Sequence, residues 1–250
     1  MASVGKETRL KRIFRDDGKT LIVAMDHGIV GAVQGLESPL KVIEKVVTGG
    51  ADAVLITLGT LRQLYRKIPR DTGLVLSIPP NPGYIETAVK AGVHAVKNTF
   101  FGSLQDRERL GLLGPLAIEC EKWGMPLLAE IVPMDTEKLE YIYEAQEVKN
   151  AARIGAEFGA DFIKTSYTGT AESFREVVEA CPIPVTIMGG AKMDTDREIL
   201  ETVKGSIDAG GSGVSFGRNI FQHRDPMAIT QAIAKIIHEE ADTEEALSSL

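Results

Sequence analysis

The sequence predicts a single-domain (β/α)8 barrel of the α/β class over residues 1–250. The first observation is length, because 250 residues suit one such barrel. The second is a repeated unit in which an amphipathic stretch passes through a glycine into a short apolar run. The third is that these runs are almost continuously apolar, as the strands of a helix-covered parallel sheet are. An open doubly wound sheet is the alternative, and it fits the number of strands less well.

A glycine followed by a short apolar run marks four of the expected strands, which lie in residues 50–57, 92–97, 159–164 and 210–216. Each glycine stands where the end of a helix needs a backbone with positive φ, and β-forming residues follow it. Further apolar runs between turn residues predict the other four strands, at residues 20–26, 74–78, 126–132 and 184–188. The total is then the eight strands of a barrel.

Amphipathic stretches between these runs predict the outer helices, at residues 39–47, 104–123, 145–158, 171–179, 196–208 and 226–238. In the last stretch, Ile229, Ile233, Ile236 and Ile237 fall on one helical face. We also expect a short N-terminal helix before the first strand. The acidic tail after Glu239 is expected to form a short helix or to fray.

Composition and charge are those of a soluble globular protein. The net charge of −7 and the pI of about 5.3 argue against a general nucleic-acid surface, although an acidic protein can still hold a locally positive pocket. Cys120 and Cys181 form no C-x-x-C pair, which argues against a disulfide or a structural zinc site. The N-terminal segment is charged, and no apolar run reaches the length of a membrane span. We therefore expect a cytoplasmic protein with no membrane or nucleic-acid partner.

Lys164 ends the expected sixth strand, in the run Asp-Phe-Ile-Lys-Thr-Ser-Tyr of residues 161–167. Chemistry in a parallel barrel gathers where the strands end. If Lys164 faces inward among apolar side chains, lost hydration lowers its amine pKa and leaves a neutral fraction that can attack a carbonyl. A lysine at the barrel rim, or one paired with a carboxylate, has the same sequence signature, so position alone leaves both open.

Asp26 and His27 end the first strand. Strand alternation places Asp26 on the face of Ala24, whereas His27 turns away or enters the following loop. A carboxylate at the barrel mouth could accept a proton or bind a substrate hydroxyl. A turn or cap is the structural alternative for Asp26, because Gly28 follows closely, and packing in the loop is the alternative for His27.

Two glycine turns follow the last two expected strands. Gly189 and Gly190 form the first, and Gly217 with Arg218 forms the second. Backbone N–H groups at glycine turns bind phosphate, and phosphate sites of barrels lie after strands seven and eight. Arg218 adds a fork of donors suited to phosphate. The pair of turns predicts a phosphate site more strongly than either alone.

Other polar residues lie inside the expected strands. Lys97 ends the fourth strand and Glu130 lies within the fifth, so the two could meet as a buried pair. Residues 135–147 form a charged, tyrosine-containing segment that is longer than most βα loops. Such loops often cover active sites.

Four motifs together resemble the archaeal-type class I fructose-bisphosphate aldolase family, and they are residues 25–28, 159–169, 189–192 and 213–222. That family also contains aminodideoxyheptulosonate synthases and a thiolase of bacterial signal-molecule breakdown. The resemblance implies a TIM barrel, with Lys164 as the Schiff-base lysine and Asp26 as the acid near the substrate. It also implies that the two glycine turns, Gly189 with Gly190 and Gly217 with Arg218, bind phosphate.

The function that this resemblance implies is a metal-independent and cofactor-free aldolase. Its substrate would be a phosphorylated ketose similar to fructose 1,6-bisphosphate, as in glycolysis or gluconeogenesis. Family members also imply a homo-oligomer built as a ring or as stacked rings.

One departure from the family concerns proton transfer. The family carries a tyrosine at the end of strand five, where this sequence has Val132. Glu130, on the same strand face, is the first candidate for a replacement, and the alternatives are His27, Tyr167 and a tyrosine of the Tyr141–Tyr143 segment. The departure leaves rival functions open: transaldolase-type synthesis or thiolytic cleavage on the same lysine, an isomerase without a covalent lysine, and a phosphate-binding barrel that has lost catalysis.

Overall fold

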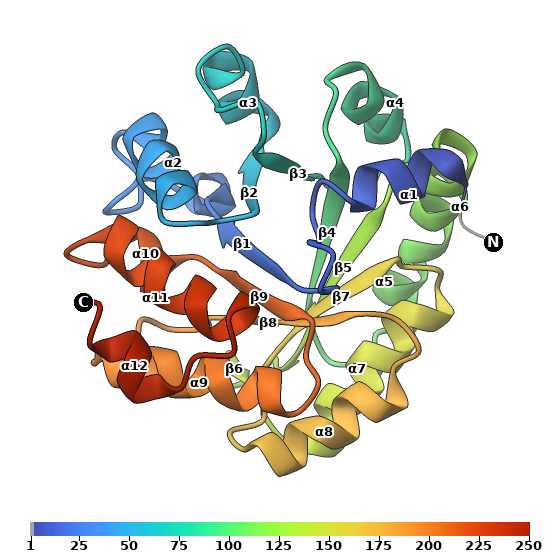
Figure 1. The fold of residues 1–250 in the computed structure, drawn as a ribbon. Coiled ribbons are helices and arrows are strands. Elements are labelled where there is room, and N and C mark those ends of the chain that lie inside the picture. Colours follow the sequence, from blue (N-terminus) through green and yellow to red (C-terminus); the bar gives the residue numbers. More distant parts are fainter. Residues whose placement is uncertain (1–2) are drawn as a thin grey trace.

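Eight parallel strands close into a barrel in the computed structural model, which describes residues 3–250, and the predicted fold class is confirmed (Figure 1). Neighbouring strands follow chain order around the ring, and β4 pairs with β5 to close it. These strands are β1 (Thr20–Ala24), β2 (Ala53–Thr57), β3 (Gly73–Ser77), β4 (Ala95–Gly102), β5 (Leu127–Asp135), β7 (Phe162–Thr165), β8 (Val185–Met188) and β9 (Gly213–Phe216). A short antiparallel strand, β6 (Glu140–Tyr141), continues β5 as a hairpin.

Helices surround the barrel and separate consecutive strands, as Figure 1 shows. The longer ones are α2 (Pro39–Thr48), α4 (Gly83–Lys90), α6 (Leu113–Trp123), α7 (Ala145–Glu157), α8 (Ala171–Ala180), α9 (Asp196–Asp208) and α11 (Pro226–His238). The shorter ones are α1 (Val4–Leu10), α3 (Leu58–Leu64), α5 (Arg107–Gly111), α10 (Arg218–Phe221), α12 (Thr243–Leu247) and the 3-10 helix η1 (Asp26–Val30). The acidic tail thus forms a short helix, α12.

The amphipathic stretch at residues 104–123 forms two helices instead of the one expected, because α5 ends at Gly111 and α6 starts at Leu113. The reason lies in Pro115, which has no N–H to donate to the carbonyl of Gly111 and whose ring clashes with that carbonyl in a continuous helix. The amide of Leu112 instead donates to the carbonyl of Arg109 at 3.2 Å.

The glycines of the repeated unit adopt the backbone that the sequence predicts for them. Gly50, Gly92, Gly159 and Gly210 have φ values of +96°, +73°, +92° and +93°. Residues with a Cβ are disfavoured in this region, so glycine lets each helix end and turn directly into the next strand. This turn repeats four times around the barrel.

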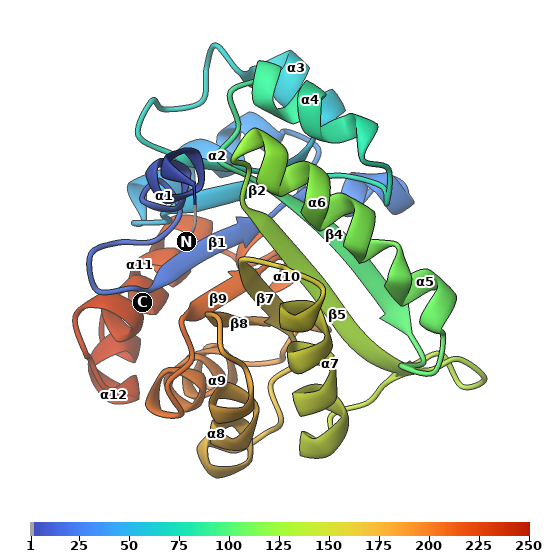
Figure 2. The ribbon, with the colours of Figure 1, turned by 90° about the vertical axis from the view of Figure 1, so that its right-hand side faces the viewer.

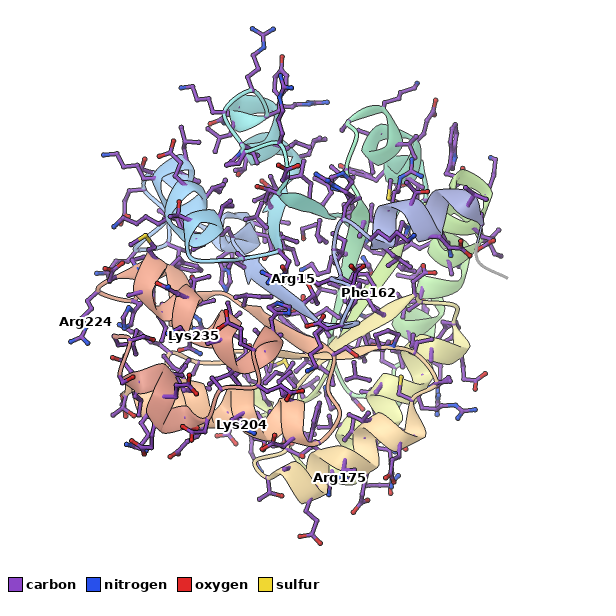
Figure 3. The ribbon with its side chains drawn as sticks, in the orientation of Figure 1. Arg15, Phe162, Arg175, Lys204, Arg224 and Lys235 are labelled. Carbon is purple, nitrogen blue, oxygen red and sulfur yellow. The ribbon has the colours of Figure 1, made fainter. Side chains whose placement is uncertain are left out.

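Apolar side chains fill the half of the barrel where the strands begin. Phe162 lies toward the centre of the ring, whereas Arg175 and Arg224 lie at its periphery (Figure 3). Phe14, from the segment before β1, packs edge-on against Phe162 with 5.2 Å between ring centroids. The other buried members of this interior cluster are Ile13, Ile22, Ala24, Ala53, Leu55, Val75, Ala95 and Leu128.

A buried lysine anchors the N-terminal helix near this closed end. Lys6 of α1 is 4% exposed, and its Nζ lies 2.8 Å from Glu121 and 3.0 Å from Asp161. Asp161 immediately precedes β7, so the ion pair of Lys6 and Asp161 belongs to the end of the barrel where the strands start.

Cys120 of α6 and Cys181 are both free thiols, as expected. Within residues 3–250, no helix combines the length and apolar character that crossing a membrane requires.

Candidate active site

A polar layer lies directly above the apolar filling, toward the end where the strands finish. Lys97, Glu130 and Lys164 each follow an inward-facing apolar residue by two positions, so strand alternation turns them into the barrel as well. The register places Glu130 beside Lys164, and the three residues are at most 5% exposed. β4 and β5, which carry Lys97 and Glu130, run side by side along the barrel (Figure 2).

Four charged side chains form one continuous ion chain across the barrel. Asp26 Oδ2 lies 2.7 Å from Lys97 Nζ, which lies 2.8 Å from Glu130 Oε2. The other carboxylate oxygen of Glu130, Oε1, lies 2.6 Å from Lys164 Nζ. Thr99 joins at the middle, with its hydroxyl 2.6 Å from Lys97 Nζ and 2.8 Å from Glu130 Oε2. Two carboxylates and two ammonium groups make the chain neutral, which lets all four stay buried.

The charges in this chain hold one another in the ionised form. Burial alone would raise the pKa of Asp26, but the charges of Lys97 and Lys164 outweigh burial and lower it. Burial likewise opposes ionisation of Glu130, yet Lys164 and Lys97 lower its pKa well below the usual range. For Lys97, burial is outweighed by Glu130 and Asp26, which raise its pKa. Glu130 is therefore a carboxylate in direct contact with the amine of Lys164.

His27 lies next to the ion chain but makes no short contact with it. Its Nδ1 lies 4.0 Å from Asp26 Oδ1, and its ring packs edge-on against Phe221 at 5.2 Å. Burial lowers the pKa of His27, and the charges of Lys164 and Arg218 lower it further against the pull of Asp26. The lowered pKa favours the neutral imidazole, and the buried Nδ1 has no hydrogen-bond partner among residues 3–250. His27 also packs so closely on Gly217 that a Cβ there would lie 2.4 Å from its ring.

The two glycine turns meet beside the ion chain. Arg218 Nη2 donates to the carbonyl of Gly190 at 2.6 Å, and its buried Nε has no hydrogen-bond partner in the described part of the chain. Gly190 has a φ of +61°, which favours glycine. Asn219 ties the turns together, because its amide donates to the carbonyl of Gly189 at 2.9 Å. Its position directly after Arg218 was the available sequence signal, and sequence reasoning did not select it.

A cavity of about 510 Å³ brings these groups together. Every residue that the sequence predicted for the site lines it, namely Lys164, Asp26, Glu130, His27, Gly189, Gly190, Gly217 and Arg218. Lys97 and Thr99 also line it. Sequence reasoning placed Lys97 in the barrel interior as a partner for Glu130 but gave it no role at the site.

The candidates for the missing strand-five tyrosine fall into two groups. Glu130, His27 and Tyr141 of the β5–β6 hairpin line the cavity, whereas Tyr143 lies outside its lining, next to Gly190. Tyr167 does not line it either, because its ring packs against Phe174 and its hydroxyl faces Gly205 of α9. We therefore exclude Tyr167 from contact with Lys164. Val132 is completely buried and has no group that could transfer a proton.

Comparisons with known proteins show which family the chain is similar to. Residues 20–223 match the family model described as DeoC/LacD family aldolase. The chain is 37% identical over 262 residues to 2-amino-3,7-dideoxy-D-threo-hept-6-ulosonate synthase of Halobacterium salinarum, which covers 99% of this chain and 97% of the relative. It is also 33% identical over 257 residues to 2-amino-3,7-dideoxy-D-threo-hept-6-ulosonate synthase 1 of Archaeoglobus fulgidus, a match that covers 98% of this chain and 95% of that relative. A solved Schiff-base-forming fructose-1,6-bisphosphate aldolase superposes with a TM-score of 0.82 at 26% identity, covering 93% of this chain and 100% of that structure.

Proposed function

Because the chain belongs to the DeoC/LacD family of aldolases, and is thus a carbon–carbon lyase, we propose that Lys164 forms a Schiff base with the ketone of a phosphorylated sugar. The observation that carries this proposal is the contact of 2.6 Å between Lys164 Nζ and Glu130 Oε1 inside a cavity that also holds the two glycine turns. A buried amine with a proton acceptor at hydrogen-bond distance is the arrangement that nucleophilic amine catalysis needs.

Proton movement begins at this contact. The ion pair keeps Glu130 ionised in the resting site, so Glu130 takes up the ammonium proton of Lys164 only as the amine attacks the carbon of the bound ketone. The proton then returns from Glu130 to the carbinolamine hydroxyl, which leaves as water and gives an iminium. The iminium carries the positive charge that Lys164 carried before, so the chain of Asp26, Lys97 and Glu130 stabilises it without a change in net charge.

Cleavage of the carbon–carbon bond uses the iminium as the electron sink. A base removes the proton of the hydroxyl beside the bond, the bond breaks to release an aldehyde, and an enamine stays on Lys164. Asp26 is the first candidate for this base, because its carboxylate faces the cavity from the other end of the chain, with a side chain 12% exposed. Protonation of the enamine and hydrolysis then free Lys164.

Phosphate binding in this proposal falls to the two glycine turns. Arg218 lines the cavity, and its Nε has no hydrogen-bond partner among residues 3–250, so its guanidinium is the side-chain donor proposed for a phosphate oxygen. Gly217 lets this turn pack closely against His27 and the carbonyl of Ala24, since a Cβ there would lie 2.4 and 2.9 Å from them. His27 thus shapes the turn, and its lowered pKa makes it a neutral hydrogen-bonding group and not a cation.

A synthase-type transfer of the enamine to a second carbonyl compound is the second candidate reaction. The relatives that favour it are the two heptulosonate synthases, at 37% and 33% identity over nearly the whole chain. Both reactions begin with the same Schiff base. They differ in whether the enamine is protonated or captured by an aldehyde.

The experiment is a substrate panel with two lysine variants. The wild-type protein should release an aldehyde from at least one ketose phosphate, and Lys164→Met should lose this activity by at least about a factor of 10⁴. Lys122→Met is the matched control, because this α6 lysine has a side chain that is 66% exposed and forms its ion pair with Glu119 on the same helix, away from the cavity. Normal turnover by Lys164→Met would refute the proposal. Adding candidate aldehydes to the same assay separates cleavage from transfer.

A further inference from the structure

Ser215 of β9 carries a hydroxyl that the ion chain does not use. The residue lines the cavity but is only 1% exposed, and its Oγ has no hydrogen-bond partner in the part of the chain that the structure describes. Its neighbours Val214 and Phe216 belong to the apolar cluster that includes the outer helices, so strand alternation turns Ser215 into the barrel. A buried hydroxyl without a partner destabilises the fold, and a bound ligand is one way to satisfy it.

Ser215 lies in the same layer of the barrel interior as the two lysines of the ion chain. In a (β/α)8 barrel the inward side chains form layers of four, which come from alternate strands. The observed pairings put Leu55 of β2, Lys97 of β4, Lys164 of β7 and Ser215 of β9 in one such layer. In ring order, Ser215 is therefore the member of the layer that follows Lys164.

The two flanks of Lys164 carry different groups. On the side of β5, Glu130 Oε1 lies 2.6 Å from Lys164 Nζ. On the other side come β8 and then β9. The hydroxyl of Thr186 on β8 donates to a backbone carbonyl at 2.8 Å, and Met188 of β8 has no hydroxyl to offer. Of the side chains of β8 and β9, Ser215 thus has the hydroxyl that a ligand on this flank can use.

Met188 controls access to this hydroxyl. The register pairs Met188 with Ser215, and both residues line the cavity. Methionine is unbranched and changes rotamer easily, so it can move aside for a ligand atom. A ligand held by Lys164 can then reach the Ser215 hydroxyl.

The chemistry of the first step calls for a donor at this place. The oxygen of a ketone becomes negatively charged as an amine attacks its carbon, and a preorganised donor stabilises that charge. Glu130 takes up the proton of Lys164 in the same step and does not donate one. A donor for the oxygen must therefore come from another side chain, and the flank opposite Glu130 holds the Ser215 hydroxyl.

We propose that Ser215 is a further catalytic residue, whose hydroxyl donates a hydrogen bond to the carbonyl oxygen of the ketone and stabilises the charge that forms there as Lys164 attacks. This inference rests on the proposed Schiff base. Ser215 neither gains nor loses a proton in the step. The oxygen keeps another lone pair, which takes the proton that Glu130 returns before water leaves.

The rate of Schiff-base formation tests this role. The protein is mixed with dihydroxyacetone phosphate, fructose 1-phosphate or fructose 1,6-bisphosphate, quenched with borohydride after set times, and analysed by peptide mass spectrometry. Ser215→Ala should form the Lys164 adduct at least about tenfold more slowly than the wild-type protein, because a donor to the developing charge is lost. An equal rate in the two proteins overturns the inference.

Ser206→Ala is the matched control. Ser206 of α9 is also fully buried, and its Oγ likewise has no hydrogen-bond partner in the described residues, but it does not line the cavity. This variant should form the adduct at the wild-type rate. A loss of rate as large as that of Ser215→Ala would contradict a specific role for Ser215.

Stability separates this role from a structural one. Removal of a buried hydroxyl that has no partner should leave the midpoint of urea unfolding unchanged or raise it, in both serine variants. A lower midpoint for Ser215→Ala would show that the hydroxyl supports the fold, and would contradict the inference.

Ser215→Cys separates the hydrogen bond from the space that the side chain fills. A thiol has a similar shape but is a weak donor, so adduct formation should stay at least about fivefold slower than in the wild type. A wild-type rate in Ser215→Cys would assign the effect to packing and overturn the inference.

The same measurements distinguish a failure of this inference from a failure of the proposed function. A wild-type adduct on Lys164 whose rate does not depend on Ser215 refutes the inference alone. If the wild-type protein forms no adduct with any of the three probes, the Schiff base is refuted, and the role of Ser215 with it.

Discussion

Replacing Lys97 by methionine removes the cation at the centre of the ion chain while keeping the apolar stem of the side chain. Lys97 Nζ contacts Asp26, Glu130 and Thr99 at 2.7, 2.8 and 2.6 Å. After the substitution, Asp26 has lost its ion-pair partner and Glu130 keeps Lys164. The chain then has a net charge of −1, and burial favours the uptake of a proton by one carboxylate, for which Asp26 is the expected site.

The size of the effect follows from this loss. Removing one partner of a buried ion pair costs about 3–5 kcal/mol, and one unit of pKa shift corresponds to about 1.4 kcal/mol. In the wild type, the lowered pKa of Asp26 contributes stability above its unfolded value of 3.8, and this contribution is lost as pH falls. In Lys97→Met we expect the pKa of Asp26 to lie above its unfolded value. The destabilisation relative to wild type should therefore grow as pH rises.

Two assays measure this prediction. Urea unfolding of both proteins at pH 5 and pH 7 gives the difference in unfolding free energy, which should be larger at pH 7. In the pH profile of kcat/KM, the pKa that sets the acidic limb should move to higher pH in Lys97→Met. If this pKa rises above 7, kcat/KM at pH 7 should fall about tenfold for each further pH unit.

Lys6→Met is the matched control. Lys6 is as deeply buried as Lys97 and also contacts two carboxylates, but it lies at the opposite end of the barrel. Its loss should lower stability and leave the acidic limb in place. An unmoved limb in Lys97→Met, or an equal shift in both variants, would refute the assignment of Lys97 as the group that keeps Asp26 and Glu130 ionised.

Three further predictions concern other parts of the molecule. Glu130→Gln should lower kcat by about 10² to 10⁴ with a smaller change in KM, because it removes the proton acceptor beside Lys164; steady-state kinetics with an undiminished kcat would speak against that role. Gly217→Ala should raise KM for the phosphorylated substrate, since the new Cβ would lie 2.4 Å from His27. Gly111→Ala is the control, because its Cβ would enter open space and KM should stay unchanged. Equal KM values for the two variants would contradict the role of the Gly217 turn in binding phosphate. Burial, together with the charges of Arg12 and Arg9, lowers the pKa of His94 from 6.5 to about 4. The free energy of unfolding should therefore fall as pH drops from 6.5 to 4, because the unfolded state takes up a proton there and the folded state does not. If His94→Gln shows the same pH dependence of unfolding free energy, groups other than His94 cause it.

Much of the fold could be predicted from the sequence, because its determinants are local. Glycines at positive φ, such as Gly159, mark where helices end, and apolar runs mark buried strands. The break between α5 and α6 was missed, although Pro115 carried the signal. The β5–β6 hairpin depends on the pairing of Met134 with Tyr141, a contact that local patterns do not specify.

The site residues that could be predicted from the sequence are those that lie at or near the ends of strands. Strand alternation and position were enough to bring Asp26, Glu130 and Lys164 into one cavity. The continuous ion chain through Lys97 depends on side-chain distances between strands, and these are set by the closure of the barrel. Assembly into a ring and a cytoplasmic location stay predictions.

Reductive trapping tests the central proposal most directly. The wild-type protein is incubated with a reactive ketose phosphate and borohydride, digested, and analysed by peptide mass spectrometry. The proposed Schiff base predicts a stable adduct on the peptide that contains Lys164, absent without substrate and absent in Lys164→Met. An adduct on Lys97 in place of Lys164, or turnover without any adduct, would contradict it.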